Sequence, residues 1–302
     1  MQLLGVDLSV ERLQFIVVLL LLVGVLLYIR FLRKYRKPLR DQEPQNMTQG
    51  PMSDTEIERY ARHLILREVG GAGQQKLRKS RVLVVGAGGL GSPVLQYLAA
   101  AGVGTLGFID DDIVSLSNLQ RQVLFDEDQL DMPKVFAAEA KLNALNPHIT
   151  IRPYNRLLSQ KNAQDLFADY DLVLDGTDNF KTRSLVNAAC VATRTPLISG
   201  AISQWEGQVS LFDPANNTPC YACIFPEEPA DGLAPSCAEA GVMGALPGII
   251  GSIMAAEAIK HITGAGQTLA GEMLIFDALY GESRKIGLQK DDGCSVCGLT
   301  LR

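Results

Sequence analysis

Short runs of branched apolar residues alternate with segments of helical periodicity along most of the chain. The runs are typical of strands buried on both faces of a parallel sheet, and the periodic segments are typical of the helices that cover such a sheet. The expected strands are residues 82–85, 105–110, 150–153, 172–174 and 196–199. The expected helices between them are residues 93–101, 133–145, 161–168 and 182–192. This alternation predicts an α/β fold with a Rossmann-like, doubly wound and mostly parallel sheet.

The pattern changes in the second half of the chain. The strand-like runs there suggest an antiparallel C-terminal extension, and they are residues 207–213, 273–277 and 284–288. Residues 244–263 are apolar and rich in glycine, which indicates at most a buried helix broken near Pro247 and Gly251. Glu257 and Lys260 lie within this segment and argue against a membrane span there.

The first 52 residues differ from the rest. Residues 13–29 are almost wholly apolar, and roughly 17–25 such residues span a bilayer. The basic residues that follow place the C-terminal side in the cytoplasm. We therefore expect a short extracytoplasmic tail (1–12), a single transmembrane helix (13–29), a basic flexible linker (30–52) and a globular domain (53–302) at the inner membrane. A true start at Met47 or Met52 would instead give a cytoplasmic protein.

The globular part opens with a helix signal. Ser53 and Glu56 have the form of a capping box. Apolar residues then follow at helical spacing: Ile57, Tyr60, Leu64 and Ile65. Arg62 lies off this stripe, and its spacing alone places it on a solvated face.

A glycine-rich turn joins the first expected strand of the sheet to the next helix. Its glycines are Gly86, Gly88, Gly89 and Gly91. Glycine permits a tight turn and lets backbone N–H groups approach a phosphate at a helix N-terminus. The next strand ends in Asp110 and Asp112, where the ribose of a dinucleotide would lie. The order strand, turn, helix, strand, acid predicts nucleotide binding.

Further polar residues follow strand ends and are expected on the same rim of the sheet. They are Asn118, Arg121, Lys134 and Asp178. Arg121 and Lys134 could neutralise a triphosphate, and Asp178 could hold its Mg²⁺. The sequence has no G-x-x-x-x-G-K-[ST] motif, so a P-loop enzyme is excluded. The cationic pair favours ATP over NAD, with an NAD-dependent oxidoreductase as the alternative.

Four of the six cysteines form two C-x-x-C pairs. They are Cys220, Cys223, Cys294 and Cys297. Two closely spaced pairs suit a tetrahedral, structural Zn²⁺ site. Two disulfides are the alternative, which a cytoplasmic domain disfavours.

The remaining cysteines lie in different settings. Cys190 falls in an apolar helical run and reads as a core residue. Cys237 lies in a polar loop, residues 226–241, and is either a nucleophile near the rim or an incidental exposed thiol. The three histidines are scattered and indicate no catalytic metal site.

Length and charge narrow the classes of function. The 302 residues allow one large domain or two small ones. The net charge is −5, and the N-terminal segment is basic, so the globular part is more acidic than the whole. An acidic body argues against nucleic acid as the main partner.

The chain resembles the MoeB/ThiF/HesA family, bacterial relatives of ubiquitin-activating enzymes. Besides the paired C-x-x-C, the motifs that carry the resemblance are Gly86-Ala-Gly-Gly-Leu-Gly91, Asp110-Asp-Asp112, Ser117-Asn-Leu-Gln-Arg-Gln122 and Thr177-Asp-Asn179. The resemblance covers residues 53–298, and residues 236–243 are nearest to the molybdopterin-synthase branch. It implies ATP-dependent adenylylation of the C-terminal Gly-Gly of a ubiquitin-like sulfur carrier (MoaD- or ThiS-like), with release of pyrophosphate, in molybdopterin cofactor biosynthesis. The same step in thiamine biosynthesis is the alternative.

The resemblance also implies roles for individual residues. It places Asp112 at the ribose, Asn118, Arg121 and Lys134 at the phosphates, and Asp178 on Mg²⁺. It places Arg62 on the nucleotide of a partner subunit, which replaces the solvated-face interpretation and implies a homodimer. Cys237 aligns with a cysteine that forms a thioester or persulfide in some members. No rhodanese domain follows Arg302, so a separate sulfur donor is expected, either a cysteine desulfurase or a rhodanese. The membrane anchor departs from the usual pattern of the family.

Overall fold

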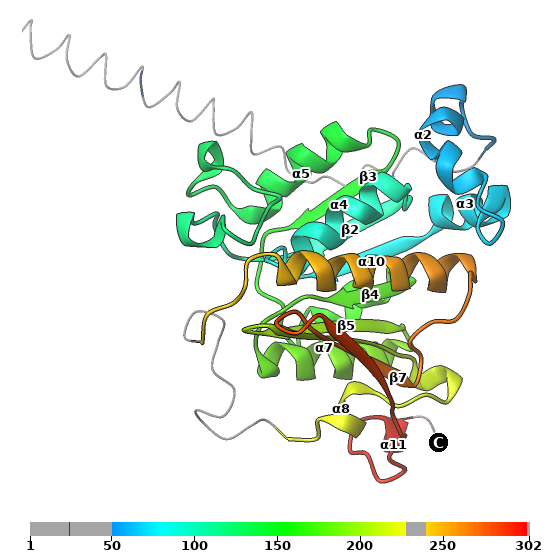
Figure 1. The fold of residues 1–302 in the computed structure, drawn as a ribbon, viewed down its shortest axis with the longest axis vertical. Helices are drawn as coiled ribbons and strands as arrows, with labels where there is room; N and C mark the ends of the chain where they lie inside the picture. Colours follow the sequence, from blue (N-terminus) through cyan, green and yellow to red (C-terminus); the bar gives the residue numbers. More distant parts are fainter. Residues whose placement is uncertain (1–23, 25–49, 228–239, 301–302) are drawn as a thin grey trace, which may run out of the picture. The chain divides into compact units, whose positions relative to one another are not determined.

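The computed structural model describes Gly24, residues 50–227 and residues 240–300, and the account that follows concerns these residues (Figure 1). Residues 47–302 form one compact unit and residues 1–46 another. Every described residue except Gly24 belongs to the first of these units.

An eight-stranded sheet forms the centre of this unit, in the order β3-β2-β1-β4-β5-β6-β7-β8. Its strands are β1 (Arg81–Val85), β2 (Thr105–Ile109), β3 (Thr150–Tyr154), β4 (Leu172–Asp175), β5 (Leu197–Ser203), β6 (Glu206–Phe212), β7 (Glu272–Asp277) and β8 (Glu282–Gly287). The first five pair in parallel, and β5 to β8 pair antiparallel. The α/β, Rossmann-like sheet and its antiparallel extension are therefore confirmed, as one mixed sheet.

Helices cover both faces of the sheet (Figure 1). They are α2 (Asp54–Leu64), α3 (Gly70–Lys79), α4 (Gly91–Ala101), α5 (Lys134–Leu145), α6 (Ala163–Phe167), α7 (Phe180–Thr193), α8 (Tyr221–Ile224), α10 (Leu246–Thr263) and α11 (Cys297–Thr300). Along β1, Val82 and Val84 pack with α4, α5 and α10, whereas Leu83 and Val85 pack with α6 and α7. Because successive side chains of a strand point to opposite faces, a strand covered on both sides requires this uninterrupted apolar run.

Helix α10 is continuous, so the predicted break near Pro247 and Gly251 is wrong. Pro247 lies in the first turn of α10, where its missing N–H has no intrahelical partner to lose. A Cβ on Gly251 would come within 2.6 Å of the Leu90 carbonyl oxygen and 2.4 Å of Pro93 Cγ. The glycine is therefore a packing requirement, and it lets α10 lie against the start of α4.

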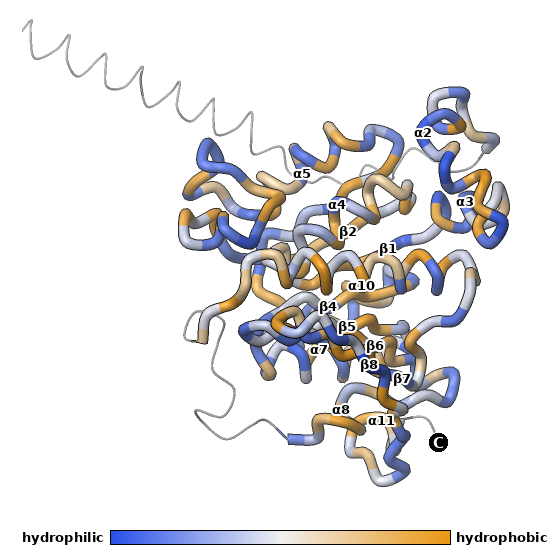
Figure 2. The backbone as a smooth tube through the Cα atoms, in the orientation of Figure 1, coloured by the Kyte–Doolittle hydropathy of each residue, from blue (hydrophilic) through white to orange (hydrophobic). Residues whose placement is uncertain are grey.

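Strand β8 forms an exposed edge of the sheet. All six of its residues are exposed, and its tube is mostly blue in Figure 2, in contrast to the orange segments of the central strands. Lys285 of β8 pairs with Glu272 of β7 at 2.7 Å. Charged side chains on an edge strand oppose its pairing with other chains.

The transmembrane helix expected from the sequence is not supported by the described residues. In the described part of the chain, no helix is long and apolar enough to cross a membrane. The longest described helix, α10, has 18 residues. Its apolar sequence is interrupted by Glu257, Lys260 and His261. Apart from Gly24, residues 13–29 lie outside the described residues, as do residues 1–12 and most of residues 30–52. The transmembrane helix and the single-pass inner-membrane localisation are not retained.

Helix α2 has the predicted capping box. The Ser53 Oγ accepts a hydrogen bond from the Glu56 N–H at 3.3 Å, and the Ser53 N–H donates to Glu56 Oε2 at 2.9 Å. Tyr60 is buried, but Ile57 is 45% exposed and Ile65, just past the helix, is 73% exposed. Part of the apolar stripe is therefore left uncovered by the described residues.

Candidate nucleotide site and cysteine cluster

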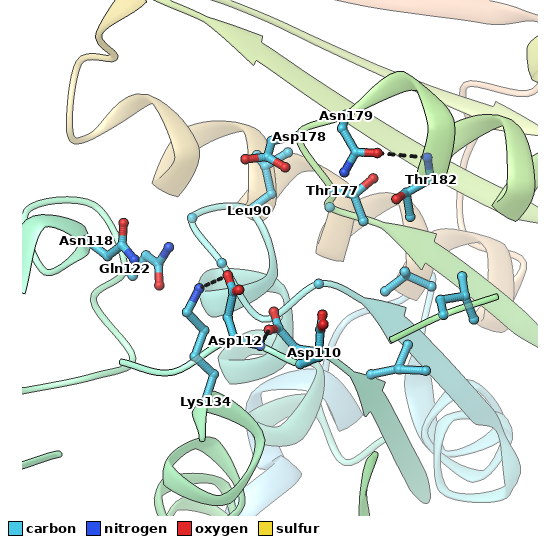
Figure 3. A pocket seen from close by; sticks show the side chains of 18 of the residues that line it. Leu90, Asp110, Asp112, Asn118, Gln122, Lys134, Thr177, Asp178, Asn179 and Thr182 are labelled. Carbon is cyan, nitrogen blue, oxygen red and sulfur yellow. Dashed lines mark hydrogen bonds and ion pairs between the residues drawn. The ribbon is translucent and has the colours of Figure 1, made fainter. Parts of the chain in front are cut away.

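A cavity of about 330 Å³ opens at the carboxyl ends of β1, β2 and β4, where the strand order of the sheet reverses. In such sheets this crevice is the usual ligand site. Figure 3 shows Lys134 and Asp112 on one side of it and Asp178 on another. The cavity brings together most of the predicted site: Gly86, Gly88, Gly89, Asp110, Asp112, Asn118, Arg121, Lys134 and Asp178.

Close backbone contacts shape the glycine turn. Gly86 has a φ of 89°, in the left-handed region that favours glycine. A Cβ on Gly91 would lie 1.9 Å from the Gly86 carbonyl oxygen, so the position has room only for hydrogen. Gly91 begins α4 and does not line the cavity, whereas Gly88 and Gly89 do. The N-terminus of α4, which is favourable for an anion, therefore lies at the cavity wall.

Asp110 fastens the turn to the end of β2. Its Oδ2 accepts a hydrogen bond from the Ala87 N–H at 2.7 Å, and its Oδ1 accepts one from the Asp112 N–H at 2.8 Å. Burial raises the pKa of Asp110, against the opposing effects of Lys134 and of these hydrogen bonds. This carboxylate therefore organises the backbone of the pocket that it also lines.

Lys134 places a buried cation beside the cavity. Its Nζ pairs with Asp112 Oδ2 at 2.8 Å, and the Lys134 side chain is 3% exposed against 71% for Asp112 (Figure 3). A buried ammonium group requires a charged or polar partner, and Asp112 supplies one from the rim. A polyanion in the cavity would compete with Asp112 for this ammonium group.

Arg121 and Asn118 form a second polar pair on the wall. Arg121 Nη2 donates to Asn118 Oδ1 at 2.9 Å, and Nη1 donates to the Ser117 carbonyl oxygen at 3.2 Å. The adjacent Gln122 is buried, and its Oε1 has no hydrogen-bond partner among the described residues. A bound ligand with a donor group would satisfy this oxygen.

The loop after β4 carries Asp178 to the cavity. The buried Asp175 accepts two hydrogen bonds at Oδ1, from the Thr177 N–H at 2.9 Å and from the Thr177 hydroxyl at 2.7 Å. Asn179 caps α7, because its Oδ1 accepts a hydrogen bond from the Thr182 N–H at 2.9 Å (Figure 3). Between these two anchors, Asp178 is exposed and lines the cavity.

The two C-x-x-C motifs meet in one cluster. The Sγ atoms of Cys220 and Cys294 are 3.7 Å apart, those of Cys223 and Cys297 3.5 Å, and those of Cys220 and Cys223 3.9 Å. A disulfide would need about 2.05 Å. Four thiolates around a tetrahedral ion at about 2.3 Å lie about 3.8 Å apart. The four cysteines are free thiols, and their sulfurs could hold a metal ion.

The thiols of this cluster differ in their readiness to lose a proton. Burial raises the pKa of Cys220 to about 11. Burial would also raise the pKa of Cys294, but backbone hydrogen bonds from Cys297 and Val296 outweigh it and lower the pKa to about 7. A metal ion binds thiolates. Of these two cysteines, Cys294 has the lower pKa and therefore forms the thiolate more easily.

Besides Gly91, one described residue of the predicted site is not part of the cavity wall, and another predicted residue is not described. Arg62, on α2, is exposed and is absent from the described residues of its own chain that line the cavity. Cys237 lies outside the described residues. Cys190, predicted as a core residue, is buried in α7.

The cavity also contains residues that the sequence did not single out as site residues. They are Arg156, Leu157, Leu158, Thr182 and Arg183. Thr182 and Arg183 lie in the first turn of α7, directly after Thr177-Asp-Asn179, and this adjacency was a usable signal. The other three follow β3, and nothing in their local pattern marks them.

The sheet order, the glycine turn and the cationic wall define a Rossmann-like α/β protein of the nucleotide-binding class. The chain belongs to the ThiF family, whose model matches residues 60–296. It is 49% identical over 247 residues to the sulfur carrier protein adenylyltransferase of Thermus thermophilus, covering 80% of this chain and 91% of that one. It is 46% identical over 247 residues to the molybdopterin-synthase adenylyltransferase of Escherichia coli, covering 82% and 98% respectively. Its enzyme class is that of these relatives, adenylyltransferase.

Longer relatives and solved structures extend this picture. The chain is 48% identical to the probable adenylyltransferase/sulfurtransferase MoeZ of Mycobacterium tuberculosis and spans 62% of its length. The crystal structure of PaaA has a TM-score of 0.69 at 24% identity, covering 89% of this chain and 83% of PaaA. The microcin C7 biosynthetic enzyme MccB has a TM-score of 0.72 at 23% identity, covering 82% and 77%. These two structures share the fold.

Proposed function

We propose that this adenylyltransferase uses ATP to activate the C-terminal Gly-Gly of a ubiquitin-like sulfur carrier, in molybdopterin cofactor biosynthesis. One observation carries the proposal: Arg121, Lys134 and Asp178 surround a single cavity at the glycine turn. The cavity belongs to a chain that covers 98% of a molybdopterin-synthase adenylyltransferase at 46% identity. The carrier of thiamine biosynthesis is the second candidate, because the matching family is ThiF.

The reaction is a displacement at phosphorus. A carboxylate oxygen of the terminal glycine attacks the α-phosphorus of ATP, and a new C–O–P linkage gives the acyl-adenylate. The bond between the α-phosphorus and the bridging oxygen breaks, and its electron pair leaves with pyrophosphate. Because the nucleophile and the triphosphate are both anionic, cationic side chains must offset their repulsion.

The residues of the cavity would divide this work. Lys134 and Arg121 would offset charge on the phosphates, with Asn118 orienting the Arg121 guanidinium. Asp112 would bind the ribose once the phosphates engage Lys134. Asp178 would hold Mg²⁺, which supplies neutralisation of phosphate charge when it is bound.

We propose that the cysteine cluster holds a structural Zn²⁺. The sulfur separations support this assignment, and four protein thiolates leave no open position on a tetrahedral ion. Metal analysis of the purified chain should then give about one zinc per chain, lost in Cys297→Ser. A wild-type protein without zinc would contradict the assignment.

We propose that the enzyme works as a homodimer in which Arg62 reaches the partner's nucleotide. Arg62 is exposed, and the exposed apolar residues Ile57 and Ile65 lie on and just past the same helix. A further group of exposed apolar side chains follows β2: Ile113, Leu116, Val123, Leu130, Met132 and Phe136. Large apolar side chains exposed along one segment are typical of a protein–protein interface, and a second copy would cover them.

Sulfur must reach the activated carrier in a later step. We propose a separate donor, a cysteine desulfurase or a rhodanese, because the longer relatives are named for adenylyltransferase and sulfurtransferase functions together. The part of Cys237 in this step stays a prediction. Sulfur delivery that is unchanged in Cys237→Ala would dismiss that thiol.

Exchange of labelled pyrophosphate into ATP tests the proposed reaction. Exchange should require a carrier ending in Gly-Gly and should fall at least about 100-fold in Asp178→Ala, because several kcal/mol of charge stabilisation are lost. A carrier truncated by its last two glycines is the control substrate. Wild-type enzyme that fails to exchange with either class of sulfur carrier would overturn the proposed function.

A further inference from the structure

The loop that carries Asp178 is fixed at its base by a hydrogen-bond network. Asp175, at the end of β4, is 1% exposed, and its Oδ1 accepts both the N–H and the hydroxyl of Thr177. A buried carboxylate that binds two donors of one residue restrains that residue's backbone and side chain together. The conformation of Thr177 therefore sets where the next residue, Asp178, enters the cavity.

Arg183 binds the same residue at its carbonyl group. It lies in the first half of α7, is 7% exposed, and donates from Nη2 to the Thr177 carbonyl oxygen. Its charge also acts on Asp175: burial raises the pKa of that carboxyl, and the nearby guanidinium opposes the shift. Thr177 is thus bound at its N–H, hydroxyl and carbonyl, and a loop restrained at three atoms has little freedom to re-aim Asp178.

The network continues to the cysteine cluster. The Tyr221 N–H donates to Asn187 Oδ1 at 2.9 Å, and Asn187 Nδ2 lies 3.7 Å from Cys220 Sγ. The Tyr221 ring packs edge-on against Phe212, with centroids 5.8 Å apart. Asn187, in the middle of α7, therefore connects this helix to the cysteine cluster.

We propose that Asp175, Thr177 and Arg183 are positioning residues that aim Asp178 at the cation of bound ATP, with α7 held to the cysteine cluster as their support. The proposal rests on the proposed function, because it gives Asp178 a cation to hold. It assigns a role to α7 beyond packing: one end of the helix carries the loop of the nucleotide site, and Asn187 ties its middle to Cys220.

Two substitutions of Thr177 test the network. Thr177→Val removes the hydroxyl that bonds Asp175, and Thr177→Ser keeps it. Thr193→Val is the matched control, because it removes a hydroxyl that bonds a backbone carbonyl of α7 away from the cavity. The measurement is the Mg²⁺ concentration that gives half-maximal pyrophosphate exchange, together with the maximal rate and the thermal unfolding midpoint.

We expect this Mg²⁺ concentration to rise about tenfold in Thr177→Val, which loses one hydrogen bond, and to change less than about twofold in Thr177→Ser. Saturating Mg²⁺ should restore most of the rate, and Thr193→Val should match the wild type. A merely structural role would lower the unfolding midpoint and leave the Mg²⁺ dependence unchanged, which would overturn the proposal. Equal Mg²⁺ dependence in all four proteins would overturn it as well.

Different results would contradict the proposed network and the proposed function. A wild type that lacks exchange overturns the function, and titration calorimetry with MgATP then tests the network by the same comparison. Weaker MgATP binding in Thr177→Val than in Thr177→Ser and Thr193→Val would support the network. Equal binding in the three variants would dismiss it.

Discussion

At Gly91 the start of α4 passes so close to the preceding turn that a Cβ would lie 1.9 Å from the Gly86 carbonyl oxygen and 2.9 Å from its carbonyl carbon. Both obstacles are backbone, so no side chain can move away to make room. We expect Gly91→Ala to lower the free energy of unfolding by at least about 3 kcal/mol and to abolish MgATP binding. Chemical denaturation and titration calorimetry measure the two effects.

Gly248 provides the matched control for this substitution. It also lies near the start of a helix, α10, and a Cβ there would meet nothing within 4 Å. Gly248→Ala should therefore raise the free energy of unfolding by about 0.5–1 kcal/mol, the ordinary gain of alanine over glycine in a helix. A Gly91→Ala protein as stable as Gly248→Ala would show that the turn can relax, and would contradict the contact argument.

At the scale of elements, a buried ion pair joins α2 to α3. Glu56 Oε1 accepts a hydrogen bond from Arg78 Nε at 3.0 Å, and the two side chains are 9% and 4% exposed. Burial tends to raise the pKa of Glu56, but hydrogen bonds from Ser53 and the charge of Arg78 outweigh it, so the folded pKa lies below the usual 4.5. A carboxyl with a lowered folded pKa stabilises the fold above its unfolded pKa, and this contribution is lost as the pH falls through the folded value.

We expect Glu56→Gln to lower the free energy of unfolding by about 3 kcal/mol at pH 7, because it removes the buried negative charge that pairs with Arg78. The difference from wild type should shrink as the pH falls below about 4.5, where wild-type Glu56 itself becomes protonated. Glu272→Gln, which breaks the exposed pair with Lys285, should change stability by less than about 1 kcal/mol. A gap that stays constant from pH 7 to pH 3 would contradict the role of the Glu56 charge.

The individual strands and helices also differ in how well the sequence predicted them. The run Val82–Val85 predicted β1 because burial on both faces leaves no polar position, and the two C-x-x-C spacings predicted the cysteine cluster because short loops fix each pair. The helix break predicted near Pro247 is wrong, because a proline in the first helical turn removes no intrahelical hydrogen bond. Arg183 was missed because its partner, Thr177, is identified only once α7 folds back against the loop.

At the scale of the whole molecule, the proposed homodimer makes each site depend on two chains. Arg62→Ala and Asp178→Ala should each abolish pyrophosphate exchange alone. In a one-to-one mixture of the two variants, about half of the dimers are mixed, and each mixed dimer has one site with neither change. The mixture should therefore regain about a quarter of the wild-type activity.

The mixture of Lys134→Ala with Asp178→Ala is the matched control for this complementation. Both of these residues line the same cavity of one chain, so no pairing of the two variants restores an intact site. Activity should therefore return only when the Arg62 variant is one of the partners. If Arg62 acted within its own chain, the first mixture would stay as inactive as the control, and the exposed position of Arg62 on α2 would need another explanation. Return of activity would instead assign to α2 and its uncovered apolar residues the task of delivering a cation to the partner's cavity.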